Sequence, residues 1–505
     1  MSTDALDQLK SIDRELQLLS KTVSLLHWDQ ETYMPDDGID MRSDEIALLT
    51  GMIHERGTSD EYGALLADLG ADDEHPDGGS EVPDEDRALI RCLYRDYRRE
   101  QKLPAELVRR FAVVTSMGQA VWARAREAND FSIFRDHLAE IIDLNRERAA
   151  RFGYDEHPYD ALLDEYEPDM KASEVRTVFD QLQKDLVPIS GRIQAAEQVD
   201  DSFLHQAYPI DGQRAFSRRV LEAIGWPFSR GRLDESAHPF TTDIGSMDVR
   251  LTTRYAPDFL NPALFGTIHE AGHGLYELGV ASKYHGTSLA SGTSLGIHES
   301  QSRTWENMIG RSREFWQYFY PELVRTFPGL LDTVDLDRFY RGINRVESSF
   351  IRVEADEVTY SLHIMLRFRL ELALIEGSLN VDDLPEAWRA MSRELLGIAP
   401  ESDAEGVLQD IHWSMGAMGY FPTYALGNLY GAQFYKVMTE AIPDAADQIA
   451  HGNFVDILEW QREHIHSHGR AKTARELVKD ISGQALDARY FTEYLNKKYG
   501  EVYQL

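Results

Sequence analysis

The N-terminal segment places apolar side chains on one face of a helix. Steps of three and four residues separate Leu9, Ile12, Leu16, Leu19, Val23 and Leu26. This spacing predicts an amphipathic helix of about two heptads, and the pattern stops before Pro35. We interpret the apolar face as core packing against a neighbouring helix rather than as a coiled coil.

Helical spacing continues along most of the chain. It predicts helices near residues 104–128, 131–152, 172–197 and 212–224, and mostly helix again from about 261 to 505. Residues 72–87 are instead acidic and rich in turn-forming residues, which predicts a solvated loop.

One segment departs from the helical pattern. Residues 248–255 (DVRLTTRY) alternate in polarity and contain several β-branched residues, which predicts a strand. The sequence has no βαβ rhythm and no glycine-rich phosphate loop, so nucleotide-binding α/β folds are disfavoured. We therefore expect a mainly helical protein with a small β element.

Composition shows that the chain can bury a large core. It has 505 residues, of which 43% are hydrophobic and 10% aromatic, and this excludes intrinsic disorder and collagen-like repeats. The single cysteine, Cys92, excludes an intrachain disulfide and cysteine-rich zinc folds. Its place in a helical run predicts a small buried apolar side chain.

The charge balance is strongly acidic. Asp and Glu number 86 against 52 Lys and Arg, for a net charge of −34. Such a surface repels phosphate backbones and anionic lipids, so nucleic acid and membrane partners are not expected. Only 11 of the basic residues are lysines, and we interpret this acidic, lysine-poor composition as an adaptation to a high-salt cytoplasm.

We expect neither an N-terminal signal peptide nor a membrane span. The N-terminus lacks the basic start and apolar run of a signal peptide. No stretch approaches 18 uncharged apolar residues, the length that a membrane span needs. We expect a cytoplasmic protein.

The most informative motif is His269-Glu270-Ala271-Gly272-His273. On a helix, positions i and i+4 share a face, so both imidazoles can bind one metal ion. The glutamate beside them is placed to take a proton from a metal-bound water. Asn261 is the expected cap of this helix, Pro262 suits its first turn, and Gly279 ends its periodic stretch.

The motif alone is suggestive rather than decisive, because HExxH arises by chance in roughly 5% of chains of this composition. A catalytic zinc needs a third protein ligand and an open position. Glu299, 26 residues after His273, would complete a His2Glu site, and an exposed helical glutamate is the alternative. His298 competes with it, but adjacent helical residues point about 100° apart, so only one of the two can bind.

Several ordered blocks carry a resemblance that extends over most of the chain. Besides the HEAGH motif at 269–273, they are residues 28–35, 238–240, 248–252, 298–301, 351–356 and 406–413. With these blocks the chain resembles the carboxypeptidase Taq (M32) family of metallocarboxypeptidases. Their order and spacing follow the family pattern, with no departure at the motif positions.

The resemblance implies an all-α gluzincin fold with a small β-hairpin or sheet near the active site. It further implies a deep groove similar to those of neurolysin and angiotensin-converting enzyme, and a homodimer. We expect residues 1–505 to form one peptidase domain, in which residues 1–200 cap the groove and residues 238–430 carry the catalytic motifs.

The family removes single C-terminal residues from peptides with broad specificity, and zinc or cobalt supports its activity. Carried over by motif position, the resemblance makes His269, His273 and Glu299 the ligands of one metal ion per chain. It makes Glu270 the general base. The partners expected of such an enzyme are peptides with a free C-terminus.

An exopeptidase must also recognise a free carboxylate, which an arginine fork does well. Arg352 and Arg250 are the candidates. Each has a simpler interpretation as an ion pair, Arg352 with Asp356 and Arg250 with Asp248.

Four further residues are candidates for substrate contacts. His412 could donate a hydrogen bond to the substrate, or simply pack beside Trp413. Tyr420 or Tyr424 could stabilise an oxyanion, or both could belong to the core. His238 could line the groove, or sit in a turn before Pro239.

His464, His466 and His468 form a last histidine cluster. No carboxylate accompanies them at a matching spacing, and Gly469 ends the helix, so we interpret them as structural.

Two other functions stay open: a zinc oligopeptidase that cleaves internal bonds of short peptides, and a non-catalytic helical zinc-binding protein. The glutamate of the HEAGH motif argues against the second, because a structural site needs no base.

Overall fold

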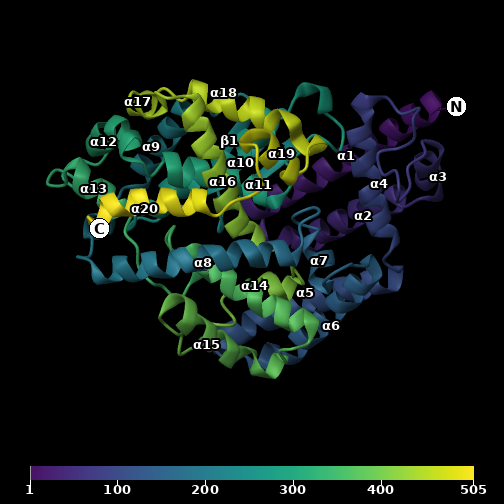
Figure 1. Cartoon of the computed structure of the whole chain (residues 1–505), viewed down its shortest axis with the longest axis horizontal. Coiled ribbons are helices and arrows are strands. Elements are labelled where there is room, and N and C mark those ends of the chain that lie inside the picture. The colour runs from purple at the N-terminus through teal and green to yellow at the C-terminus, as the bar shows by residue number, and fades with distance from the viewer. Residues whose placement is uncertain (1) are drawn as a thin grey trace.

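The computed structural model of the chain describes residues 2–505. Helices dominate it, as the sequence pattern predicts (Figure 1). In the N-terminal half they are α1 (Ser2–Thr32), α2 (Ile39–Gly57), α3 (Asp60–Asp68), α4 (Asp84–Gln101), α5 (Ala105–Ala128), α6 (Ser132–Phe152), α7 (Pro158–Leu163), α8 (Ala172–Ala195) and α9 (Ile210–Ala223).

The C-terminal half continues with α10, which carries the HEAGH motif, and the helices that follow it. They are α10 (Asn261–Gly279), α11 (Leu295–Arg303), α12 (Arg313–Thr326), α13 (Leu336–Ile343), α14 (Tyr360–Glu376), α15 (Leu384–Leu396), α16 (Pro422–Ala441), α17 (Ala445–Ala450), α18 (Val455–His464), α19 (Ala474–Ser482) and α20 (Arg489–Tyr503). A π-helical turn, η4 (Thr304–Ile309), directly follows α11.

The strands among residues 2–505 form one small sheet. It comprises β1 (Gly231–Glu235), β2 (Thr241–Gly245) and β3 (Asp248–Thr253), in the order β1-β3-β2. The central strand β3 pairs in parallel with β1, Leu251 opposite Leu233, and antiparallel with β2, Leu251 opposite Thr241. The predicted strand is confirmed, although it ends two residues earlier than expected.

The small sheet that the family resemblance implies is confirmed, but the sequence pattern does not locate its strands β1 and β2. Their sequences, GRLDE and TTDIG, are short and carry charged or small residues. They lack the apolar alternation that reveals β3, whose Val249 and Leu251 are fully buried. Their strand conformation comes from pairing with β3.

The predicted loop at 72–87 ends earlier than expected, because α4 begins at Asp84. Asp84, Glu85 and Asp86 form the first turn of that helix. Negative side chains there are stabilised by the partial positive charge of the helix N-terminus, so this part of the acidic run favours a helix start.

Three hydrophobic clusters hold the helices together. The largest joins α5, α6, α8, α14, α16 and α20, and a second packs α9, α10, α12, α13 and β3 together. The third is smaller and lies among α1, α3 and α4. In Figure 1 these N-terminal helices lie at the right, while α14, α15, α5 and α6 lie below α10, α11 and α16. No helix within residues 2–505 is long and apolar enough to cross a membrane.

The apolar face of α1 is only partly a core face. Leu9 and Ile12 are buried in the third cluster, but Leu19 and Val23 keep intermediate exposure. The predicted core packing therefore holds for the first half of the helix.

Candidate active site

Helix α10 presents the HEAGH motif. The helix begins at Asn261, after the turn that follows β3, and has Pro262 in its first turn. It ends at Gly279, as predicted. The prediction that Asn261 caps it is wrong: Leu260 occupies the N-cap position, and no side chain caps the helix. Asn261 lies inside the first turn, where its side-chain oxygen is buried without a hydrogen-bond partner.

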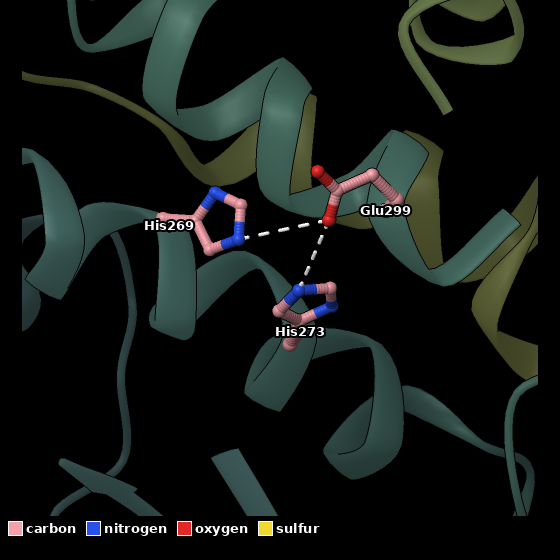
Figure 2. Close-up of side chains that lie close together, drawn as sticks. All are labelled: His269, His273 and Glu299. Atoms are coloured by element: carbon pink, nitrogen blue, oxygen red, sulfur yellow. Dashed lines mark ion pairs between the residues drawn. The ribbon is translucent and has the colours of Figure 1, made fainter. Parts of the chain in front are cut away.

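The structure brings His269, His273 and Glu299 together (Figure 2). The Nε2 atoms of His269 and His273 lie 3.6 Å and 3.5 Å from Oε2 of Glu299. Donor atoms around a tetrahedral zinc ion lie about 3.3–3.5 Å apart, given metal–ligand distances of about 2.0–2.2 Å. Two imidazoles and one carboxylate are also a ligand set that zinc favours, so these residues fit a metal ion.

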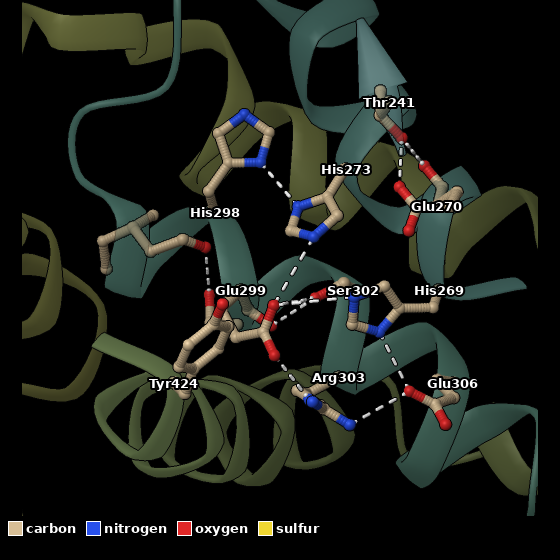
Figure 3. Close-up of polar contacts among 12 residues, drawn as sticks. Thr241, His269, Glu270, His273, His298, Glu299, Ser302, Arg303, Glu306 and Tyr424 are labelled. Carbon is tan, nitrogen blue, oxygen red and sulfur yellow. Dashed lines mark hydrogen bonds and ion pairs between the residues drawn. The ribbon is translucent and has the colours of Figure 1, made fainter. Parts of the chain in front are cut away.

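Helix α11 decides between Glu299 and His298 as the third member of this cluster. Ser294 caps α11 through its side chain, and the helix packs across α10 and α16. Glu299 faces α10 with a side chain only 7% exposed. His298 points away from the centre of the cluster and contacts the back of His273 (Figure 3).

The ring of His269 is held from behind by a carboxylate. Its Nδ1 atom lies 2.9 Å from Oε2 of Glu306, in the π-helical turn η4. Glu306 also accepts hydrogen bonds from Arg303 and Arg311. A carboxylate at Nδ1 places the proton there and leaves the lone pair of Nε2 directed at Glu299.

The ring of His273 is held by a second histidine. Its Nδ1 lies 2.7 Å from Nδ1 of His298, and Nε2 of His298 lies 2.6 Å from Oε1 of Glu277. The amide of Gly292 donates to the same Glu277 oxygen, so this oxygen is an acceptor. A neutral His298 then donates from Nε2 to Glu277 and accepts at Nδ1 from His273. This order leaves the lone pair of His273 Nε2 free for a metal ion.

Burial and charge give His273 and Glu299 ionisation states that suit metal binding, whereas the neighbouring carboxylates raise the pKa of His269 against the effect of its burial. Burial lowers the pKa of His273 to about 4, so its ring is neutral at pH 7. Burial opposes ionisation of Glu299, but Arg303 outweighs it and holds the pKa of that carboxyl well below its usual range. Arg303 donates from Nε to Oε1 of Glu299 at 2.6 Å, and Ser302 donates to Oε2 at 3.0 Å.

Glu270 lies beside the two histidines and is held by the sheet. The hydroxyl of Thr241, in β2, lies 2.7 Å from Oε2 of Glu270 and 2.9 Å from its backbone oxygen. Burial raises the pKa of Glu270 above its usual value of 4.5. A raised pKa brings a carboxylate closer to the range in which it can both accept and return a proton.

Arg352 does not pair with Asp356, so that interpretation is wrong. Asp356 instead accepts hydrogen bonds from the amides of Val358 and Thr359, at the start of its own turn. Arg352 binds Asp410 through Nε at 2.9 Å and Nη2 at 2.8 Å. Its Nη1 donates to the hydroxyl of Tyr360 at 2.9 Å.

The same aspartate binds a second arginine. Arg367, fully buried in α14, donates from Nε to Oδ2 of Asp410 at 2.7 Å. Two guanidinium groups therefore share one carboxylate, so Arg352, Arg367 and Asp410 together carry a net positive charge. Burial opposes ionisation of Asp410, but Arg367 and Arg352 outweigh it and keep its pKa well below the usual range.

Arg250 forms the ion pair that its sequence neighbour suggested. It binds Asp248 through two hydrogen bonds of 2.9 Å and 2.7 Å. Its guanidinium group also lies over the ring of Trp28, 4.2 Å from the ring centre. Asp248 thus engages Nε and Nη2 of Arg250, the same two atoms through which Arg352 binds Asp410.

His412, Tyr420 and Tyr424 lie close together. Nε2 of His412 lies 3.1 Å from the hydroxyl of Tyr424, and its Nδ1 atom is buried without a partner. Burial lowers the pKa of His412 to about 4. Arg352 lies 5.0 Å from the ring centre of Tyr424, which places this group beside the paired arginines. Figure 3 shows Tyr424 on the Glu299 side of the cluster formed by His269, His273 and Glu299.

The remaining candidates lie apart from this cluster. His238 is exposed in the loop between β1 and β2. His464 ends α18, and Gly469 interrupts the following turn with a φ of 49°. His466 is buried, with Nε2 2.9 Å from the side-chain oxygen of Gln301. Within residues 2–505, His269, His273 and Glu299 are the only three potential ligands grouped closely enough to hold a metal ion.

Sequence reasoning missed the residues that orient the cluster, namely Thr241, Glu277, Arg303, Glu306, Arg367 and Asp410. Of these, only Asp410 lies in a motif block, the one at 406–413. Glu306 follows Glu299 by two turns, but the π-helical turn decides where it points. No local pattern in the sequence marks that turn.

Comparisons with known proteins agree on one family. A family model described as carboxypeptidase Taq (M32) metallopeptidase matches residues 8–499. Thermostable carboxypeptidase 1 of Thermus thermophilus is 41% identical, with 99% of each chain covered. Carboxypeptidase 1 of Bacillus subtilis is 38% identical, with 96% of each chain covered. The crystal structure of an M32 carboxypeptidase from Deinococcus radiodurans superposes with a TM-score of 0.96 at 38% identity, covering 99% of this chain and 100% of that one.

Proposed function

The chain belongs to the carboxypeptidase Taq (M32) metallopeptidase family, and on this basis we propose that it is a zinc-dependent enzyme that removes single C-terminal residues from peptides. The observation that carries the proposal is the convergence of His269, His273 and Glu299, with Glu270 beside them. The rings of both histidines direct Nε2 at Glu299 because other partners occupy their Nδ1 atoms.

His269, His273 and Glu299 are the proposed ligands of one metal ion. When bound, zinc polarises the scissile carbonyl and lowers the pKa of a coordinated water towards about 7. Cobalt suits the same ligands. The side chains of His269 and His273 are 19% and 18% exposed, so they are within reach of solvent and substrate.

Glu270 is the proposed general base. It accepts the proton of the attacking water and returns it to the leaving amine. Thr241 holds its carboxylate by a hydrogen bond to Oε2, which leaves Oε1 available for the proton. His412, Tyr420 and Tyr424 are the proposed donors to the substrate and to the oxyanion that develops.

The paired arginines support recognition of a free C-terminus. Asp410 neutralises only one of the two buried charges of Arg352 and Arg367. Because an uncompensated buried charge is unfavourable, a substrate carboxylate beside Arg352 would restore neutrality. This preference favours exopeptidase action over cleavage of internal bonds. Arg250 and His238 are the weaker candidates for substrate contact.

One pair of peptides tests this proposal. Incubation with a free-acid peptide and with the same peptide amidated at its C-terminus should release one residue from the first only, as read by mass spectrometry. A chelator should abolish release, and added zinc should restore it. Equal cleavage of both peptides would favour an oligopeptidase. Bound metal with no cleavage of either would favour a non-catalytic protein.

We also propose a homodimer, formed through α1 and α2. These helices pack against each other, yet no residue of α2 is buried. Their exposed apolar side chains are Leu18, Leu25, Met41, Leu48 and Met52. An apolar face of this kind is typical of a protein contact. Light scattering should give twice the chain mass, and Leu48→Glu should give the monomer mass. A monomeric parent protein would contradict the proposal.

The remaining expectations complete this proposal. Residues 1–505 would act as one peptidase domain, with residues 1–200 capping a groove that contains the motifs of residues 238–430. A single buried cysteine, Cys92, accords with a reducing, cytoplasmic location. The expected substrates are peptides produced by general protein turnover.

A further inference from the structure

A buried lysine near the C-terminus lies behind the candidate active site. Lys498, on α20, has a side chain that is only 7% exposed. An ammonium group has three hydrogens to donate, and Lys498 has three partners. They are Oε2 of Glu357 at 2.7 Å, the backbone oxygen of Asn307 at 3.0 Å and the hydroxyl of Tyr494 at 3.1 Å.

The first partner belongs to the segment that carries Arg352. Glu357 directly follows the block at 351–356, and its side chain is only 3% exposed. Tyr499, also on α20, donates to the same oxygen at 3.1 Å. The C-terminal helix therefore anchors the arginine segment by two hydrogen bonds to one carboxylate.

The second partner belongs to the π-helical turn η4. Asn307 directly follows Glu306, whose carboxylate orients His269. The backbone oxygen of Asn307 accepts from Lys498 and from the hydroxyl of Tyr494. Because π-helical turns are wider and less stable than α-helix, hydrogen bonds from outside the turn help to hold its shape.

From these contacts we infer that Lys498 is a positioning residue that fixes the metal-ligand side of the active site relative to the Arg352 side. One ammonium group joins the turn of Glu306 to the segment of Arg352. An exopeptidase needs this distance to be constant, because it must match the span from the scissile carbonyl to the terminal carboxylate. The inference rests on the proposed function of both sides.

Removal of the ammonium group tests the inference. Lys498→Met alone leaves Glu357 buried without its cation, which is destabilising. The double variant Lys498→Met with Glu357→Gln removes both charges and should recover much of that stability. Lys497→Met is the matched control, since Lys497 is the exposed neighbour of Lys498 on the same helix.

Three measurements separate positioning from folding. They are the melting temperature, the metal dissociation constant from competition with a chelator, and KM and kcat on a free-acid peptide. We expect the folded double variant to bind zinc about five- to tenfold more weakly, somewhat less than loss of a direct orienting partner causes. Its KM should rise about threefold or more, because the carboxylate contact is displaced. The visible spectrum of the cobalt form should also change.

The outcomes decide between the two roles of Lys498. A folded double variant with the metal affinity, cobalt spectrum and KM of the parent would overturn the inference and leave Lys498 a purely structural residue. Changes equal to those of Lys497→Met would overturn it as well. Failure of the proposed function is distinguishable, because the parent enzyme itself would then release no C-terminal residue.

Discussion

At the scale of single residues, the chemistry of the site depends on the side chains that form hydrogen bonds with the proposed metal ligands. His269 and His273 are the same residue type on the same helix face, but their Nδ1 partners differ. One faces the carboxylate of Glu306 and the other faces the ring of His298. Both arrangements direct Nε2 inward, so two different environments produce one common geometry.

The role of Glu270 gives a prediction at this scale. Glu270→Gln keeps the size and the hydrogen bond with Thr241 but cannot accept a proton. We expect kcat to fall by about 10²–10⁴-fold, the range for loss of a general base, while the metal content stays equal to that of the parent protein. Steady-state kinetics and metal analysis check both parts. Near-normal turnover by this variant would contradict the assignment of the base.

At the scale of elements, close approach of helices sets the distance between the histidines and Glu299. Gly272 of α10 faces the backbone of α11, and a Cβ atom there would lie 2.5 Å from Cα of Ser302. From the other side, a Cβ on Gly427 of α16 would lie 2.6 Å from Cβ of Glu299. Only glycine permits this packing, because both neighbours are too close for a methyl group.

Substitution of Gly272 should therefore disturb the arrangement of His269, His273 and Glu299. We expect Gly272→Ala to lower the free energy of unfolding by about 1–3 kcal/mol through overpacking and to weaken zinc binding, since α10 must move away from α11. Gly266→Ala is the control on the same helix, because its nearest neighbour would be 4.0 Å away. That variant should be neutral or more stable by about 0.5–1 kcal/mol. Equal metal affinity in the two variants would contradict the packing argument.

The start of α11 depends on a buried acid. Glu167 is fully buried, and its carboxylate accepts from the amide of Gly296 at 3.0 Å and from the hydroxyl of Tyr430 at 2.9 Å. Burial raises its pKa from 4.5 to about 7. The folded protein therefore holds this proton at pH values where the unfolded chain has lost it.

Deprotonation of the buried Glu167 should destabilise the folded protein as the pH rises. The stabilisation from protonated Glu167 is complete below about pH 4.5 and is lost as the pH rises to about 7. At about 1.4 kcal/mol for each unit of pKa, the loss amounts to about 3 kcal/mol. Glu167→Gln stays neutral, so its unfolding free energy should fall less than that of the parent between pH 5 and pH 8, as measured by urea unfolding. Parallel curves for parent and variant would rule this out, and Glu85→Gln on the surface is the control.

At the scale of the whole molecule, self-repulsion should dominate the salt response. A net charge of −34 destabilises the folded state at low ionic strength, and added ions screen it. We expect the midpoint of urea unfolding to rise when KCl increases from about 0.1 M to about 2 M, where the screening length falls below about 3 Å. A midpoint that is unchanged or lower at high salt would contradict adaptation to a high-salt cytoplasm.

The sequence by itself determined the local features. The spacing of apolar residues predicted α5, α6, α8 and α9 to within three residues at each end, because helix periodicity depends on neighbours three and four positions apart. For the same reason it placed His269 and His273 on one face of α10. Family motifs added Glu299, Glu270 and Arg352 as candidates but not their partners.

Only the tertiary structure decided how distant residues meet. It paired Arg352 with Asp410, 58 residues away, rather than with Asp356 on the next turn. It directed Glu299 rather than His298 at the two histidines, through the packing of α11 between α10 and α16. It also formed β1 and β2 from sequences with no strand pattern. Contacts between distant segments depend on how whole helices and strands pack, and no short stretch of sequence contains that information.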